Sequence, residues 1–332
     1  MRKLGSLAER CHAYAKALHY REIEFEKGLF QPADTIEALI SINNHLQQPE
    51  AAKGILTHAR LTYQVELKES WYEKLQRWSD ARAAYERKQA EDPENLEWTL
   101  GRMRCHRALG DWETLEELAS ETWASGRLQQ DPTAQAEVSR LAAAATWNLR
   151  HWEAMAFYAS SMPECTVETS LVRAVLSVHA GRYHAAQLHI DSARQQLDSE
   201  FTALVGESYH RAYRIMIEVL QLTELEEIIH HREQPQAMPT DLLVRMWHER
   251  ICNVQRDSDV WQDILAVRYL AVTPREDPHT WLKFCALCRK AGRAALGRKL
   301  LSQLMLGDAQ REAYAKHGLF ADDELTAATP PV

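Results

Sequence analysis

The stretch Leu109-Gly110-Asp111-Trp112-Glu113-Thr114-Leu115 decides the fold, because versions of it return along the chain. Each version has a small or apolar residue, two turn-forming residues, a bulky residue and a short apolar step. Close versions are Leu75–Ala81 and Leu149–Met155, and weaker ones are Ala180–Ala186, Leu222–Leu225 and Ala291–Ala294. The first five bulky residues lie 34, 40, 31 and 42 residues apart, at Trp78, Trp112, Trp152, Tyr183 and Leu225.

This spacing is typical of tetratricopeptide-like helix–turn–helix units, which repeat about every 34 residues. Between the turns the apolar residues follow a helical period, as at Leu96, Leu100 and Met103. We expect the bulky residue after each turn to wedge between two helices. Because one helix pair cannot bury its apolar face alone, the pairs must stack on their neighbours. The sequence therefore predicts an all-α fold, an α-solenoid of TPR-like helix–turn–helix repeats.

Prolines mark the predicted boundaries between helices. Three of them follow an aspartate, at Asp92-Pro93, Asp131-Pro132 and Asp277-Pro278, which is typical of a capped helix start. No long linker interrupts the array. We expect one array over residues 1–318 and a disordered tail over residues 319–332.

Composition excludes several classes of protein. The 332 residues include only 12 Gly and 11 Pro, too few turn residues for a β-sandwich or barrel. The net charge of −8 argues against general nucleic-acid binding. No apolar run approaches the roughly 18 residues of a membrane span, and the N-terminus lacks the apolar core of a secretion signal. Six scattered Cys suit reduced thiols in the cytoplasm.

Catalytic motifs are weak throughout the chain. Cys285 and Cys288 form one CxxC without a second pair, and they fall in a predicted helix. The stretch Gly292–Lys299 has two glycines at phosphate-loop spacing, but Arg298 replaces the lysine and no strand precedes it. The histidine pairs lack the helical spacing of zinc ligands, at His184 and His189 and at His230 and His231. The residues by themselves predict no active site and no metal site.

One segment is unusually basic. From Arg245 to Lys299 there are 11 basic and six acidic residues. Lys283 and Lys290 are seven residues apart and share a helix face. A group of Lys and Arg on a concave surface suits a polyphosphorylated anion. The alternative is an ordinary solvent-facing basic surface, and the residues alone leave both open.

Several stretches resemble the FAT domain of the TOR kinases, within the phosphatidylinositol-kinase-related kinase family. They span about residues 4–306 and are Ala13–Tyr20, Leu39–Ala52, Trp71–Leu75, Leu100–Cys105, Ala203–Tyr209, Glu224–Glu227 and Asp277–Lys283. The resemblance fades after Leu306.

The resemblance implies a non-catalytic, partial FAT domain of a large TOR-type serine/threonine kinase that acts in nutrient and growth signalling. ATP and magnesium would then belong to a kinase domain absent from this chain. The expected partners are that kinase domain, which FAT repeats clamp and restrain, and the subunits of TOR complexes. The resemblance implies a cytoplasmic location, with the parent complex also at endomembranes and in the nucleus.

The family also has an inositol hexakisphosphate pocket. By resemblance, its basic residues fall on Arg256, Lys283 and Lys290. Because further pocket residues would follow this chain, we expect weak binding by the chain alone. The other hypotheses are a freestanding TPR-like adaptor that binds peptides and an enzyme with an unrecognised site.

Overall fold

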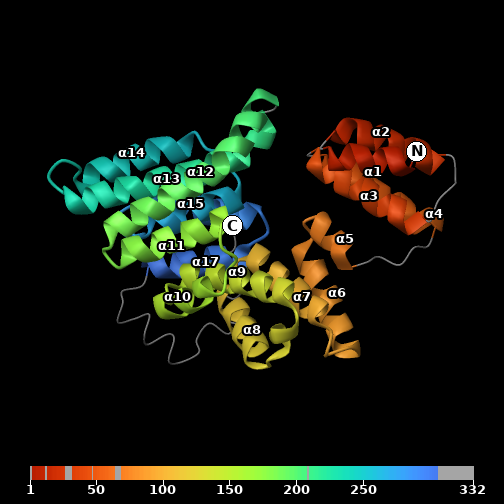
Figure 1. Ribbon diagram of the computed structural model, residues 1–332, viewed down its shortest axis with the longest axis horizontal. Coiled ribbons are helices and arrows are strands. Elements are labelled where there is room, and N and C mark those ends of the chain that lie inside the picture. The colour runs from red at the N-terminus through yellow and green to blue at the C-terminus, as the bar shows by residue number, and fades with distance from the viewer. Residues whose placement is uncertain are drawn as a thin grey trace, which may run out of the picture. The chain divides into compact units, whose positions relative to one another are not determined.

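A computed structural model describes residues 2–11, 13–26, 32–46, 48–63, 69–207 and 209–305 (Figure 1). These residues form seventeen α-helices and one 3-10 helix and contain no strand, so the predicted all-α fold is confirmed. The predicted tail, residues 319–332, lies outside the described residues. The chain divides into two compact units, Met1–Ala145 and Thr146–Val332. The single array predicted over residues 1–318 stays a prediction, and each unit is considered by itself below.

The first unit is built from consecutive helices that pack on their neighbours in the chain. Their bounds are α1 Arg2–Arg10, α2 Tyr14–Glu26, α3 Pro32–His45, α4 Pro49–Tyr63, α5 Glu69–Lys74, α6 Trp78–Glu91, α7 Leu96–Leu109, α8 Trp112–Ala124, η1 Arg127–Gln130 and α9 Pro132–Leu149, which ends in the second unit. One buried cluster joins α3, α4 and α5, with Trp71 fully buried among Ile36, Ile40 and Leu56. A second cluster joins α6 and α7 through Tyr85 and Cys105.

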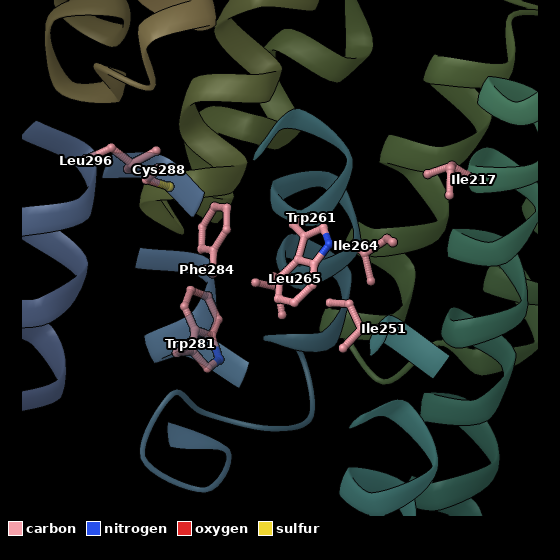
Figure 2. Close-up of a cluster of buried hydrophobic side chains, with 9 residues drawn as sticks. All are labelled: Ile217, Ile251, Trp261, Ile264, Leu265, Trp281, Phe284, Cys288 and Leu296. Carbon is pink, nitrogen blue, oxygen red and sulfur yellow. The ribbon is translucent and has the colours of Figure 1, made fainter. Parts of the chain in front are cut away.

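The second unit is also built from consecutive helices, of which α12 and α13 have 25 residues each. Their bounds are α10 Trp152–Ser160, α11 Val167–His179, α12 Tyr183–Glu207, α13 Tyr209–Glu233, α14 Thr240–Cys252, α15 Ser258–Arg268, α16 Pro278–Lys290 and α17 Ala294–Met305. Its largest described cluster draws residues from α13 to α17. Figure 2 shows Trp261 and Leu265 of α15 between Ile251 of α14 and the rings of Trp281 and Phe284 on α16. Neighbouring helices thus share one apolar seam, as stacked repeats require.

The turns between paired helices share one backbone geometry. The first or second residue after each first helix is in the left-handed region, and the next N–H donates to a carbonyl five residues back, which closes the helix end. Glycine takes this position at Gly110, Gly181 and Gly292, with φ of 74°, 70° and 79°. Gln76 and Arg150 adopt the same conformation, with φ of 56° and 62°. The repeated segment of the sequence is therefore a helix C-cap followed by a new helix.

In four of the repeats the bulky residue directly follows the turn and begins the next helix. Trp78, Trp112, Trp152 and Tyr183 are the first residues of α6, α8, α10 and α12. None of the ten tryptophans is exposed. The prediction is wrong for Leu225, which lies inside the continuous helix α13. No glycine breaks the helix there, and Thr223 bonds back to the carbonyl of Val219 within it.

Two of the three predicted aspartate caps are confirmed. The Asp131 carboxylate accepts from the Thr133 and Ala134 N–H groups at 2.9 and 3.1 Å, and Asp277 accepts from Thr280 N–H at 3.2 Å. The prediction is wrong at Asp92, which follows the last turn of α6. Asn95 caps α7 instead, because its side-chain oxygen accepts from Glu97 N–H at 3.0 Å.

Candidate functional site

The CxxC pair is part of the core. Cys285 and Cys288 lie on α16 with 5% and 0% of their surface exposed. Burial raises the pKa of both thiols, for Cys288 to about 12, so neither forms a thiolate readily at neutral pH. Among the residues that the structure describes, no group of three or more His, Cys, Asp or Glu could hold a metal ion. These cysteines therefore pack rather than react.

The glycine-rich stretch Gly292–Lys299 is a helix junction. Gly292 makes the left-handed turn after α16, and Gly297 lies so close to α16 that an added Cβ would meet the Cys285 carbonyl at 3.3 Å. Arg293 is buried and pairs with Asp259 of α15. Because its two glycines serve a turn and a close helix contact, and a helix rather than a strand precedes it, the stretch does not form a phosphate-binding loop.

The predicted basic segment loses part of its charge to ion pairs. Arg250 and Arg268 bind carboxylates of α13, and Arg293 binds Asp259. Arg256 and Lys290 are exposed and form no ion pair with any residue that the structure describes. The net charge counted along the segment therefore overstates the cations available to a ligand, although two of the three predicted anion-site residues remain available.

The three predicted anion-site residues, Arg256, Lys283 and Lys290, are named the basic surface. All three are exposed. Lys283 and Lys290 lie on α16, about 10 Å apart along its axis at 1.5 Å per residue. Lys283 Nζ lies 3.7 Å from Sγ of Cys252, at the end of α14.

Arg256 follows four residues after Cys252, in the segment between α14 and α15. That segment is held in place because Gln255 N–H donates to the Tyr213 hydroxyl at 2.8 Å, and its carbonyl accepts from Trp261 Nε1 at 3.0 Å. Lys283 is thus brought beside the end of α14, but no contact joins the three predicted residues directly.

A set of carboxylates on α13 organises the helices around it. The acidic hub consists of Glu224, Glu226 and Glu227. Glu224 has no exposed side-chain surface, and both its oxygens accept from Arg268 of α15, at 2.6 and 2.8 Å. Arg268 also donates to the Trp247 carbonyl at 3.0 Å. A buried, bidentate pair of this kind has little tolerance for loss of one partner.

The other two carboxylates of the acidic hub reach α12 and α14. Glu226 binds Arg194 of α12 with two bonds of 2.6 Å. Glu227 accepts from Arg250 at 2.7 and 2.9 Å and from Trp247 Nε1 at 2.7 Å. The Glu227 hydrogen bonds, against the opposing effect of burial, raise the pKa of Arg250. One helix thereby fixes the positions of three others.

The first unit has a similar junction between two of the family-like stretches. Arg104 of α7 donates to Glu73 of α5 at 3.1 Å and to Glu137 of α9 at 2.9 Å. Gly101, three residues earlier, lies directly against the ring of Tyr85. The stretches Trp71–Leu75 and Leu100–Cys105 are therefore contact positions between helices.

The sequence reasoning missed both ion-pair junctions. Their partners are far apart in the chain, since 44 residues separate Glu224 from Arg268. The sequence feature that could have indicated such a junction is a charged residue inside an apolar helical run, such as Glu224 between Leu222 and Leu225. Such a residue is rarely buried unless it is paired.

The helical repeats match a known domain. The family model of the FAT domain covers residues 139–325, more than half of the chain and beyond Leu306. The chain belongs to the FAT domain family. The similarity to the kinases below covers 91–98% of the chain, so it also includes most of the first unit.

The chain is 45% identical to serine/threonine-protein kinase TOR2 of Saccharomyces cerevisiae over 91% of its length. It is 43% identical to serine/threonine-protein kinase TOR of Oryza sativa over 98% and to mTor of Drosophila melanogaster over 91%. The aligned regions cover 12%, 15% and 12% of those proteins, so this FAT-domain chain corresponds to a small part of each relative. None of its described helices is long and apolar enough to cross a membrane.

Proposed function

We propose that this chain is a scaffold segment of a TOR-type serine/threonine kinase and restrains the kinase domain of its parent protein. The parent would carry out ATP- and magnesium-dependent phosphoryl transfer and would assemble with TOR complex subunits in the cytoplasm. The chain itself would contribute shape and rigidity rather than reacting groups.

The observation that carries this proposal is the extended similarity to TOR kinases, 45% identity to yeast TOR2 over 304 residues. The acidic hub supports a mechanical role. Its carboxylates tie α12, α14 and α15 to α13, so displacement of one helix disturbs the others. A rigid, multiply linked segment can transmit a restraint, whereas a flexible one cannot.

A chimera tests the proposal. The aligned segment of yeast TOR2 is replaced by this chain, and the purified chimera is assayed for phosphorylation of a protein substrate. We expect kinase activity within a few-fold of TOR2. A chimera that accumulates and purifies normally but is inactive would refute the scaffold role. The freestanding adaptor hypothesis would gain if the chain alone selected short peptides from a library while failing in the chimera.

The basic surface supports a second function, the binding of a polyphosphorylated anion such as inositol hexakisphosphate. The specific observation is that Arg256 and Lys290 are exposed without an ion pair to a described residue, and that Lys283 lies beside the end of α14. Phosphate groups would form charge-assisted hydrogen bonds with these cations.

A thermal-shift titration with inositol hexakisphosphate at low salt tests this site. We expect a small, salt-sensitive rise in the melting temperature that Lys283→Glu/Lys290→Glu abolishes. The matched control is Lys3→Glu/Arg10→Glu, because these residues are also exposed and seven apart on one helix, α1. A specific site would be contradicted if both double variants lost the rise in melting temperature equally, or if Lys283→Glu/Lys290→Glu kept it.

A further inference from the structure

A pocket in the first unit lies far along the chain from the basic surface. It has a volume of about 460 Å³ and is lined by residues of α2, α3 and α4. This volume falls within the roughly 300–1,000 Å³ of sites that bind small groups. The lining residues are Glu22, Phe25, Glu26, Leu39, Gly54, Ile55 and His58. The pocket also lies before residue 139, where the FAT-domain match begins.

The floor of the pocket is apolar and firmly supported. Leu39 is 3% exposed, and Phe25 and Ile55 pack against the buried cluster that contains Trp71. The rings of Phe25 and His58 meet edge to face, with centroids 5.9 Å apart. This contact holds the phenyl ring against His58 of α4.

Gly54 keeps one wall of the pocket open. A Cβ added to this residue would meet no atom within 4 Å. A glycine inside a helix costs about 0.5–1 kcal/mol relative to alanine. At Gly54, neither a close backbone contact nor a left-handed turn accounts for the missing side chain, and its absence enlarges the pocket.

The polar groups that line the pocket are two carboxylates and the His58 imidazole, whose ring lies against Phe25. Glu22 and Glu26 are exposed and one turn apart on α2, so their Cβ atoms are about 5–6 Å apart. Neither forms an ion pair or hydrogen bond with a residue that the structure describes. Two carboxylates above an apolar floor that contains a phenyl ring suit a cation on an aliphatic stem.

We propose that this pocket binds an arginine side chain presented by a partner protein. The methylene stem would lie on Ile55 and Leu39, as long cationic side chains commonly cover apolar surface. The guanidinium would lie near the Phe25 ring and donate to Glu22 and Glu26, which gives it both cation–π and charge-assisted contacts. Arginine fits better than lysine because its planar fork can reach two carboxylates at once.

Saturation-transfer NMR tests the pocket, with N-acetyl-arginine methylamide as the probe at millimolar concentration and low salt. The isosteric, uncharged citrulline derivative is the matched probe. We expect saturation transfer to the methylene protons of the arginine probe, and a signal at least fivefold weaker for the citrulline probe. Equal transfer to both probes would overturn the proposal. Stronger transfer to putrescine, a free diamine, would overturn the assignment to a protein side chain.

Two variants locate the binding. Glu22→Gln/Glu26→Gln removes the charges without changing size, and Gly54→Leu fills the cavity from its open wall. Each should lower the arginine signal at least fivefold while the helical circular dichroism is unchanged.

The matched control is Glu117→Gln/Glu121→Gln, because these glutamates are exposed and one turn apart on α8. The control should retain the signal. A comparable loss there, or full binding by the Gly54→Leu variant, would show that arginine does not occupy the pocket.

Discussion

Removing one partner of the buried pair between Glu224 and Arg268 should destabilise the second unit strongly. In Glu224→Leu the Arg268 guanidinium, with 4% of its side chain exposed, keeps the Trp247 carbonyl and the Trp247 ring, 5.3 Å away, but loses its bidentate carboxylate. Breaking a buried pair in this way costs about 3–5 kcal/mol. For a unit of this size, each kcal/mol lowers the melting temperature by about 2–4 °C, so we expect a fall of roughly 6–20 °C.

A double-mutant cycle separates the pair from the helices that carry it. Arg268→Met leaves Glu224 buried beside Arg250, and Glu224→Leu/Arg268→Met removes both charges. We expect the double variant to be more stable than the sum of the single effects predicts, by about 2–3 kcal/mol. The control is the half-exposed pair of Arg194 and Glu226, whose removal should cost at most about 1 kcal/mol.

Urea unfolding followed by hydrogen exchange and mass spectrometry is the appropriate assay, because peptides from α13 and α15 report on the second unit alone. Additive single effects, or a cost below 1 kcal/mol for Glu224→Leu, would refute the argument that the acidic hub holds these helices together.

Three further predictions concern packing, thiols and pH. Gly101→Ala should destabilise the first unit by about 1–3 kcal/mol, because its Cβ would lie 2.5 Å from Cε1 and Cζ of the buried Tyr85. Urea unfolding measures the loss. The control, Gly54→Ala, should show no such loss because its Cβ meets no atom within 4 Å. A disulfide reagent should label the exposed Cys11, Cys165 and Cys252 quickly in the native chain and reach Cys105, Cys285 and Cys288 only on unfolding; fast labelling of all six would contradict the buried positions. The hydrogen bond to His106, opposed by burial, lowers the pKa of Asp111 below 3.8, so this carboxylate stabilises the fold at neutral pH and the contribution is lost as the pH falls through the lowered pKa. Asp111→Asn should therefore lower the urea midpoint of unfolding at pH 7, and the difference from the unchanged chain should shrink as the pH falls below 3.8. The same difference at pH 7 and at low pH would contradict a stabilising role for the Asp111 carboxylate.

Local sequence signals predicted the helix junctions well. A turn such as Leu109–Leu115 carries its own information, because glycine permits the left-handed conformation and the following tryptophan begins the next helix. The same reasoning was wrong at Leu225, where polar residues resembled a turn but bond within one helix. It was also wrong at Asp92, because Asn95 competes as the cap.

Contacts between distant residues could not be predicted in the same way. The acidic hub depends on which helices meet, and Glu224 gives no local sign that its partner is Arg268. The three residues of the basic surface were predicted through family resemblance. Charge counting alone included Arg250, Arg268 and Arg293, which are already paired.

The most direct test of the claim that this segment restrains a kinase is a measurement of basal kinase activity. It compares the TOR2 chimera with the same chimera carrying Glu226→Gln/Arg194→Gln. This change loosens the contact of α12 with α13 and costs too little to unfold the unit. The account predicts that basal phosphorylation rises while the purified amount and melting temperature stay nearly constant. Unchanged activity in a chimera whose α12 amides exchange measurably faster would contradict it.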